Sequence, residues 1–529
     1  MISRLRRSDL TILNWPTDIA NPKLAALMLD QLLNDACART PEKTALIFGD
    51  QGYTFSELDE ITSRLATSLS ERGIKAGDRV AFLLPNCPEI VWCYFACFRI
   101  GAIAVPLNIR FGSELLRYVV GHCEAKALIS EPELFVRLGR DSLGTVEQYY
   151  LLSGHSDFAG VRSFAELLTE QGRSPEPLKL DETIPATIYY TSGTTGLPKA
   201  VIHTHGSLRQ ATDNQIAEIG ISAADKTLIM FPVCYLIGFG SQILPFLTCG
   251  ATCVLLSHFE TGLALRAIEE HRPTKTYGFP KLYQELINHP ESDRFNLRSL
   301  NFCFSGGEAI AVAIQERFEQ LFGVAITEGC GMTELQIYSL NPPYGQKKVG
   351  SIGRPICGME VRLIDESGQS LINSGAIGEI VVRGGSMTAG YWHDPERTAR
   401  TICDGWLHTG DLAYQDADGF YWFFSRQSEV IRGRAGLVSP IEVEGALYQH
   451  PTVREVGVTG FSDAGDEAVQ AHVVLKENAA SVTSTQLLNF ARQHLPAQKV
   501  PARIIIVSEL PYGPTGKIDR LTLRAQNAT

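Results

Sequence analysis

The sequence predicts an α/β fold in which mainly parallel strands alternate with helices. Short apolar, β-prone runs alternate with amphipathic segments of helical period along most of the chain. The chain has 529 residues, too many for one hydrophobic core, so two or more domains are expected. Its hydrophobic fraction of 44% and charged fraction of 20% are ordinary for a globular protein.

The first elements follow from where the helical and strand patterns begin and end. Residues up to about 30 are expected to form an irregular arm, which leads into a helical pattern. Gly73 and Gly101 each follow a helical run and are expected to end it. In order, the pattern predicts a helix at 24–38, strands at 45–48 and 53–55, a helix at 56–72, a strand at 80–84, a helix at 88–100, and strands at 102–105 and 128–130.

The stretch 227–257 is a candidate membrane segment because it contains no Asp, Glu, Lys or Arg. However, prolines and glycines interrupt it, and Gln242 lies in its middle. A buried strand–helix–strand of a large core explains this pattern better than a spanning helix. We therefore expect no transmembrane segment.

Charge and cysteine content exclude several classes of protein. The formal net charge is −11 and the pI is about 5.6, and no basic face suggests a nucleic-acid partner. The twelve cysteines form no Cys-x-x-Cys pair, which argues against both a disulfide framework and a zinc site. The arginines near the amino terminus precede no apolar run, so they do not form a secretory signal. We expect a cytoplasmic protein.

The loop at 189–199 reads Tyr-Tyr-Thr-Ser-Gly-Thr-Thr-Gly-Leu-Pro-Lys and is expected to join strands at 186–190 and 200–204. Gly193 and Gly196 let the backbone approach a ligand closely. Backbone amides can ring an anion together with hydroxyl side chains, and Lys199 adds a positive charge. The hydroxyls belong to Thr191, Ser192, Thr194 and Thr195. Phosphate is the expected ligand, although the glycine spacing is not that of a Walker A loop.

Further motifs follow in order. Residues 305–308 read Ser-Gly-Gly-Glu, 327–334 read Thr-Glu-Gly-Cys-Gly-Met-Thr-Glu, 405–411 read Gly-Trp-Leu-His-Thr-Gly-Asp, and 511–517 read Pro-Tyr-Gly-Pro-Thr-Gly-Lys. With the loop at 189–199, this order resembles the adenylate-forming superfamily of acyl- and aryl-CoA ligases, nonribosomal-peptide adenylation domains and luciferases. The resemblance runs from about residue 30 to 525 and is strongest to an acyl- or aryl-CoA ligase.

The resemblance implies an ATP site. Lys517, Lys199 and Glu334 are the implied catalytic residues, and Glu334 is the implied ligand of Mg²⁺. Asp411 would accept hydrogen bonds from both ribose hydroxyls, since a carboxylate is an acceptor with two oxygens. The implied ATP or AMP contacts are Thr191, Ser192, Gly193, Thr194, Thr195, Gly196, Lys199, Gly306, Gly307, Glu308, Gly329, Cys330, Gly331, Met332, Thr333, Asp411, Arg426 and Lys517.

The resemblance also implies an acid pocket. Amino-acid-activating relatives place an aspartate near Tyr235 to pair with the substrate ammonium, and none occurs in 231–238. A carboxylic acid without an α-amino group is therefore expected. Tyr235 stands where relatives commonly have histidine, and Cys330 where they have an aromatic residue that stacks on adenine. The implied pocket residues are Tyr235, Ile237, Ser241, Gly306, Gly331, Ile337 and Tyr338.

Two domains are implied, 1–427 for ATP and acid binding and 428–529 carrying the lysine. Ser428 is the implied hinge, and Arg434 and Ala435 would line the tunnel for the thiol. In the small domain we expect helices at 441–450 and 484–495 and strands at 453–459, 468–475 and 503–507.

The expected activity has two steps, formation of an acyl-adenylate with release of pyrophosphate and then transfer to the thiol of CoA. One alternative is an adenylating enzyme that loads the phosphopantetheine of an acyl or peptidyl carrier protein. Another is a noncatalytic nucleotide-binding homologue. A homodimer is a possible assembly.

Overall fold

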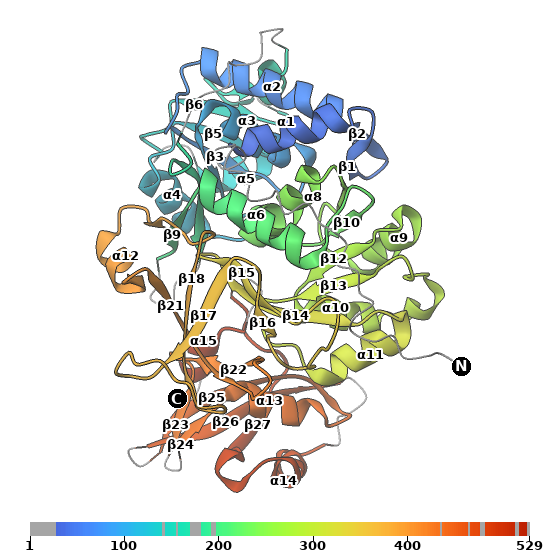
Figure 1. The fold of residues 1–529 in the computed structure, drawn as a ribbon, viewed down its shortest axis with the longest axis vertical. Coiled ribbons are helices and arrows are strands. Elements are labelled where there is room, and N and C mark those ends of the chain that lie inside the picture. The colour runs from blue at the N-terminus through green and yellow to red at the C-terminus, as the bar shows by residue number, and fades with distance from the viewer. Residues whose placement is uncertain are drawn as a thin grey trace, which may run out of the picture.

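We analysed a computed structural model of the chain. It describes residues 28–139, 143–154, 157–169, 181–191, 197–433, 436–463, 466–476, 482–513 and 518–525. These residues form a large amino-terminal domain with three sheets and a small carboxy-terminal domain with two (Figure 1). The predicted α/β class is confirmed, since parallel pairs dominate the two largest sheets.

The largest sheet has nine strands and is parallel in its centre. Its strands are β1 (Thr44–Phe48), β2 (Gln51–Thr54), β10 (Lys226–Ile229), β11 (Thr252–Leu255), β12 (Lys275–Gly278), β13 (Phe302–Ser305), β14 (Ile326–Met332), β15 (Gln336–Leu340) and β16 (Arg354–Pro355). Their order is β16-β15-β14-β13-β12-β10-β11-β1-β2. Pairing is parallel from β14 to β1 and antiparallel at both ends.

The second sheet has eight strands and contains the hairpin that flanks the predicted phosphate loop. Its strands are β3 (Arg79–Leu83), β4 (Ile103–Pro106), β5 (Ala127–Ser130), β6 (Gln148–Leu151), β7 (Arg162–Ser163), β8 (Pro185–Thr191), β9 (Lys199–Thr204) and β19 (Gly390–Tyr391). Their order is β19-β9-β8-β4-β3-β5-β6-β7. β8 and β9 are antiparallel and pair Thr191 with Lys199. The two predicted flanking strands are therefore confirmed.

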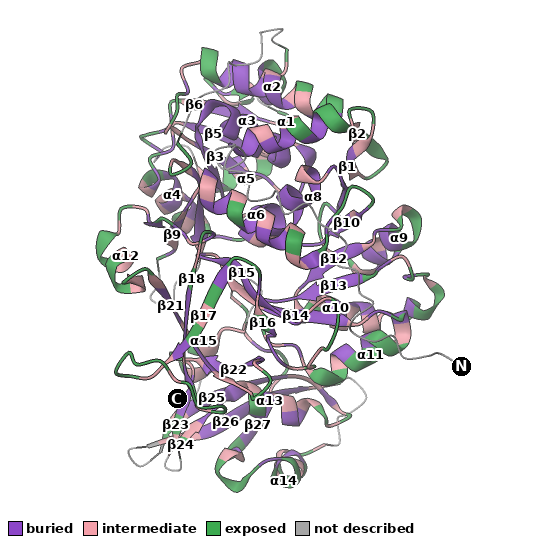
Figure 2. Ribbon diagram, in the orientation of Figure 1, coloured by how far each residue is buried: buried purple, intermediate pink, exposed green. Residues whose placement is uncertain are grey.

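Helices cover both faces of the two sheets. The shared core between the sheets includes side chains of α1 (Leu29–Arg39), α2 (Phe55–Glu71), α3 (Pro88–Ile100), α6 (His205–Ile219), α7 (Leu236–Gly238) and α8 (Leu244–Thr248). α4 (Ser113–His122) and α5 (Pro132–Leu138) cover the outer face of the eight-stranded sheet. α9 (Thr261–His271), α10 (Pro280–Asn288) and α11 (Val312–Phe322) cover that of the nine-stranded sheet. Figure 2 shows this layering, with buried strands and helices whose outward faces are exposed.

Local capping explains where the helices begin and end. Thr54 caps α2 by accepting a hydrogen bond from Glu57 N, and the Glu57 side chain accepts one from Thr54 N in return. This capping box draws Phe55 into the helix, so the predicted strand 53–55 was wrong at that residue. α3 begins with Pro88 and ends at Gly101, whose φ of 68° suits glycine. The predicted helix 88–100 is confirmed at both ends.

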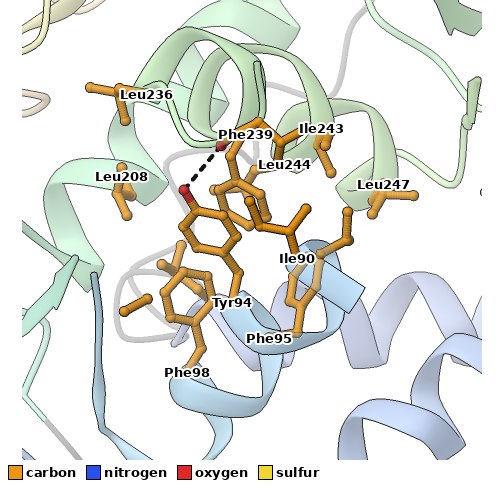
Figure 3. Close-up of a cluster of buried hydrophobic side chains, with 14 of the residues drawn as sticks. Ile90, Tyr94, Phe95, Phe98, Leu208, Leu236, Phe239, Ile243, Leu244 and Leu247 are labelled. Atoms are coloured by element: carbon orange, nitrogen blue, oxygen red, sulfur yellow. Dashed lines mark hydrogen bonds between the residues drawn. The ribbon is translucent and has the colours of Figure 1, made fainter. Parts of the chain in front are cut away.

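The uncharged stretch 227–257 folds into β10, α7, the π-helical turn η4 (Phe239–Ile243), α8 and β11. It packs on α3, where the Tyr94 ring stacks on Phe239 with centroids 3.7 Å apart (Figure 3). The Tyr94 hydroxyl also donates a hydrogen bond to Val233 O. The predicted buried strand–helix–strand is confirmed. No helix in the described residues is both long and apolar enough to span a bilayer.

A five-stranded antiparallel sheet completes the large domain, and the small domain follows it. The sheet comprises β17 (Met359–Ile364), β18 (Gly378–Gly384), β20 (Ile402–Cys403), β21 (Trp406–Gln415) and β22 (Tyr421–Arg426), with α12 (Pro395–Thr401) beside it. The small domain has β23 (Ile431–Gly433), β24 (Gly436–Val438), α13 (Pro440–Tyr448), β25 (Val453–Asp463), β26 (Asp466–Leu475), α14 (Ser484–His494), β27 (Arg503–Ile506) and α15 (Arg520–Ala525). Short 3₁₀ turns lie at Phe164–Leu167, Ser292–Arg294 and Ala497–Lys499. All five predicted elements of the small domain are present.

Candidate active site

A cavity of about 1610 Å³ is lined by residues of both domains and collects most of the predicted site. It lies where β8, β9 and the β14–β15 hairpin meet β21, β22 and the small domain. The predicted residues that line it are Thr191, Lys199, Tyr235, Ile237, Ser241, Gly307, Glu308, Gly329, Cys330, Gly331, Met332, Thr333, Glu334, Ile337, Asp411, Arg426 and Ser428. Motifs far apart in the sequence therefore share one space.

Two predicted pocket residues lie behind the cavity wall. Tyr338 is fully buried, and its hydroxyl donates a hydrogen bond to Cys330 Sγ at 3.1 Å, so it supports the wall from behind. Gly306 packs on the Phe304 ring, which would lie 2.6 Å from an added Cβ. Neither residue is among those that line the cavity. The predicted residues Ser192, Gly193, Thr194, Thr195, Gly196, Arg434, Ala435 and Lys517 lie outside the described residues.

The glycines of β14 are needed for the close pairing of β14 with β15. An added Cβ at Gly329 would lie 2.8 Å from Ser339 O, and one at Gly331 would lie 2.5 Å from Gln336 O. Contacts that short do not occur without backbone movement, so only glycine keeps the hairpin closed. Packing against β15 is the reason that the structure gives for them.

Glu334 is held at the cavity wall by a neighbouring strand. Its side chain accepts a hydrogen bond from the Tyr391 hydroxyl at 2.7 Å, and its carbonyl accepts one from Thr388 N at 2.7 Å. Among the described residues, no group of three His, Cys, Asp or Glu could hold a metal ion. A single carboxylate at the wall of this cavity still fits Mg²⁺, which takes one or two carboxylates and completes its shell with phosphate oxygens and water.

His203 supports the cavity wall through Thr333, and the motifs did not indicate it. It lies on β9, and its Nε2 is 2.6 Å from Thr333 O while its Nδ1 is 3.0 Å from Ser207 Oγ. Burial lowers the pKa of His203 to about 4, so the ring is neutral at pH 7. Because one nitrogen faces a carbonyl, that nitrogen carries the proton, and the ring fixes the backbone of Thr333. His203 and Thr333 are 130 residues apart, so no local pattern could have revealed the contact.

Asp411 and Arg426 form an ion pair on paired positions of β21 and β22. Arg426 Nε lies 2.9 Å from Asp411 Oδ1, and the Asp411 side chain is 2% exposed. Within β21, Thr409 Oγ1 accepts a hydrogen bond from Asp411 N. A carboxylate has two acceptor oxygens, which suits Asp411 to accept hydrogen bonds from hydroxyls. The neighbouring His408 does not take part in this pair: its Nδ1 lies 3.2 Å from Glu379 Oε2.

The predicted acid pocket is formed by η4, α7 and β15. Tyr235 lines the cavity, and its hydroxyl is hydrogen-bonded to the Asn108 side chain. Burial raises the pKa of Tyr235 to about 12, so its phenol is neutral at pH 7. The Ser241 hydroxyl donates a hydrogen bond to Gln336 Oε1 at 2.9 Å, so these two polar side chains of the wall are bonded to each other. Ile237 and Ile337 complete a largely apolar lining.

Cys330 stands at the position predicted to face adenine. It lines the cavity and is partly exposed, with Tyr338 behind it. Burial raises the pKa of the Cys330 thiol to about 12, so it is protonated and unreactive at pH 7. Cys330 therefore contributes a small apolar contact where the resemblance implies a stacking ring.

Glu328 is a second residue that the motifs did not single out. It lines the cavity with an exposure of 3%, and it accepts hydrogen bonds from Gln315 Nε2 at 3.1 Å and Ile310 N at 3.4 Å. Burial raises its pKa from 4.5 to about 8. Between pH 4.5 and about pH 8, the Glu328 carboxyl group is therefore protonated in the folded state and ionised in the unfolded chain. The contribution of Glu328 to stability is therefore greatest below about pH 4.5 and falls as the pH rises to about 8.

We predict that Glu328→Gln, which cannot ionise, removes this pH dependence. The slope removed is up to about 1.4 kcal/mol per pH unit. Melting temperatures measured from pH 5 to 8 should show the variant gaining stability over the wild type as the pH rises. Glu366→Gln, at an exposed position, is the matched control and should show no such trend. Parallel profiles for wild type and Glu328→Gln would contradict a buried neutral carboxyl group.

The turn between β22 and β23 is anchored on both sides. Before Ser428, Arg426 is paired with Asp411, and Gln427 N donates to Gly410 O at 2.8 Å. After Ser428, Glu429 is paired with Arg520 Nε of α15 at 3.0 Å. One side is thus attached to the large domain and the other to the small domain. Ser428 is the residue between the two attachments.

Family models, relatives and a solved structure match most of this chain. The family model for AMP-binding enzymes matches residues 33–392, and the model for their C-terminal domain matches 442–517. A long-chain-fatty-acid–CoA ligase of Bacillus subtilis (strain 168) is 32% identical over 96% of this chain and 96% of its own. A feruloyl-CoA synthase of Amycolatopsis sp is 33% identical over 90% of this chain and 95% of its own. The solved anthranilate CoA ligase AuaEII, in complex with anthranoyl-AMP, superposes with a TM-score of 0.89 at 28% identity, covering 96% of this chain and 99% of that one.

Proposed function

The chain belongs to the AMP-binding enzyme family, and from that premise we propose that it activates a largely apolar carboxylic acid that lacks an α-amino group. It is an AMP-forming acid:CoA ligase that uses ATP and CoA. The observation that carries the proposal is the single cavity. It brings the phosphate-loop hairpin, the β14–β15 hairpin, the Asp411–Arg426 pair and the small domain together.

In the first step, a carboxylate oxygen of the acid attacks the α-phosphorus of ATP, and the bond to pyrophosphate breaks. The transition state carries extra negative charge on the phosphoryl oxygens. We propose that Lys199, Lys517 and the Thr333 hydroxyl stabilise this charge, and that Glu334 holds Mg²⁺. Magnesium, when bound, supplies further charge neutralisation. The protein contributes positioning and electrostatics, without a covalent nucleophile.

The nucleotide would be held by its ribose and its phosphates. The ion-paired carboxylate of Asp411 is buried at the cavity wall, so we assign the ribose hydroxyls to it. Arg426 lies beside Asp411, and we propose that it contacts the phosphate or the ribose. The carbonyl of Thr333 is fixed by neutral His203, which holds the phosphate-facing hairpin in place.

The lining of the acid pocket supports an amine-free acid. A buried ammonium would need a carboxylate partner, and 227–257 contains none. Ile237, Ile337 and the neutral ring of Tyr235 suit an alkyl or aromatic acyl group. All twelve cysteines are free thiols, which supports a reducing compartment such as the cytoplasm.

In the second step, the CoA thiol attacks the acyl carbon and AMP leaves. We propose that the small domain, 428–529, rotates against 1–427 about Ser428 to admit the thiol. The anchors on either side of Ser428 support this boundary. Arg434 and Ala435 follow the hinge and are proposed to line the thiol tunnel.

The test is pyrophosphate release across a panel of alkyl, aryl and amino acids, with and without CoA. We expect release with amine-free acids and acyl-CoA as the product. Adenylate that gives no acyl-CoA, but forms a thioester on an added pantetheinylated carrier protein, would make a carrier the acceptor. No pyrophosphate with any acid would support a noncatalytic nucleotide-binding protein.

Cys330→Tyr is predicted to tighten ATP binding by up to about tenfold or to leave it unchanged. A ring at this position could stack on adenine, and stacking contributes about 0.5–1.5 kcal/mol. The measurement is the Kd for ATP by calorimetry, with Cys330→Ala as the control that adds no ring. A large loss of affinity in a well-folded Cys330→Tyr protein would show that adenine is seated elsewhere.

A further inference from the structure

Helix α10 of the large domain makes two contacts with the small domain across the cavity. Lys281 Nζ lies 4.7 Å from the ring centroid of Tyr512, and Gln284 Nε2 donates a hydrogen bond to Arg454 O at 3.3 Å. All four residues line the cavity, and α10 lies in the lower part of the large domain (Figure 1). Of these four residues, only Tyr512 belongs to one of the sequence motifs, the one at 511–517.

The charges around Lys281 favour this docking. The Tyr512 hydroxyl donates to Glu455 Oε2 at 2.9 Å, so the ring and a carboxylate of the small domain face α10 together. Glu285 lies one helical turn after Lys281. Burial raises the pKa of Glu285, with a smaller contribution from Glu455, while Lys281 lowers it. The Lys281 ammonium thus faces the Tyr512 ring and is attracted by the carboxyl group of Glu285, and both interactions stabilise a cation.

Tyr512 also holds one end of the segment that carries Lys517. Tyr512 and Ile518 form an antiparallel bridge, which closes the base of the segment between them. A side chain that docks Tyr512 on α10 therefore sets where this base lies. Gly513 and Ile518, the described residues at the two ends, both line the cavity.

We propose that Lys281 is a positioning residue for the adenylation step: by docking Tyr512, it holds the small domain in the orientation that presents Lys517 to the nucleotide. This rests on the proposed function of Lys517. Lys281 does not touch the reacting atoms in this role. The contact exists in one orientation of the small domain and breaks when that domain rotates for thiol transfer. Loss of the Lys281 contact should therefore slow adenylate formation and leave thioester formation unchanged.

The experiment measures two single-turnover rates, adenylate formation from ATP and acid, and thioester formation from preformed adenylate and CoA. Lys281→Ala and Tyr512→Leu should each slow the first by about two- to fivefold, the ratio expected from one partly exposed cation–π contact. Neither should slow the second. The double variant should be no slower than either single variant. Lys281→Arg, which keeps a cation over the ring, should restore the first rate.

Lys476→Ala is the matched control, because this exposed lysine of the small domain bonds Pro451 O and does not line the cavity. Equal slowing of both steps by Lys281→Ala, or additive effects in the double variant, would overturn the inference. Tyr512→Phe keeps the ring and tests the Glu455 hydrogen bond separately. Failure of the wild type to form adenylate would instead overturn the proposed function.

Discussion

Replacing Lys517 by alanine is expected to lower the rate of adenylate formation by about 10²–10³, the cost of removing one preorganised charge at a developing oxyanion. The expectation comes from the resemblance at 511–517, and it is supported by Gly513 and Ile518, which line the same cavity as Lys199, Glu334 and Asp411. The measurement is single-turnover formation of adenylate and pyrophosphate from saturating ATP and acid.

The same variant should convert preformed adenylate and CoA to thioester at close to the wild-type rate, because thiol attack does not use this charge. Lys517→Arg is the control that keeps a cation, and it should recover part of the loss. The melting temperature should be unchanged. An alanine variant that forms adenylate at the wild-type rate would show that another group stabilises the transferring phosphoryl group.

The Ser428→Pro variant is expected to form adenylate at close to the wild-type rate and to lose at least about tenfold in thioester formation. Proline fixes φ near −65° and restricts the preceding residue as well. Ser428 lies between Gln427, bonded to the large domain, and Glu429, bonded to Arg520 of the small domain. A rotation between these anchors must change the backbone torsions at or next to Ser428.

Ser428→Ala is the matched control, since it removes the hydroxyl and keeps φ free, and it should retain both steps. The comparison uses the yields of adenylate and thioester in one turnover for the wild type and both variants. Equal loss of the two steps in Ser428→Pro would place the hinge elsewhere or show that the proline disturbs the resting orientation.

Most elements of the fold could be predicted from local pattern. Helix 88–100 was correct at both ends because proline begins it and glycine ends it, and both signals are local. The strands flanking 189–199 were also predicted correctly, because each is a short apolar, β-prone run, which is likewise a local signal. The error at Phe55 has a local cause too: Thr54 is the N-cap of a capping box with Glu57, whereas Thr54 and Phe55 were both predicted to be strand. The order of strands within each sheet could not be predicted, because distant segments pair there.

The candidate site was predicted less evenly. Cavity lining by Thr333, Glu334, Asp411 and Arg426 agrees with where contiguous motifs placed them. Tyr338 was expected in the pocket and instead lies behind Cys330, because the motif identified the strand but not which side chains face the cavity. The resemblance implied Gly329 and Gly331 as contacts of ATP. They are required by the approach of β15, which depends on a neighbouring strand.

The sequence by itself determined the chemical groups of this protein: a hydroxyl- and glycine-rich loop ending in Lys199, a carboxylate at Glu334, another at Asp411, and an acid pocket without a counter-charge. These are properties of contiguous residues. Only the tertiary structure decided what each group touches. Tyr391 reaches Glu334 across 57 residues and His203 reaches Thr333 across 130, and the contact of Lys281 with Tyr512 joins two domains. Such contacts arise from packing between distant segments, and the sequence around a residue carries no local or periodic signal of which distant residue it will contact.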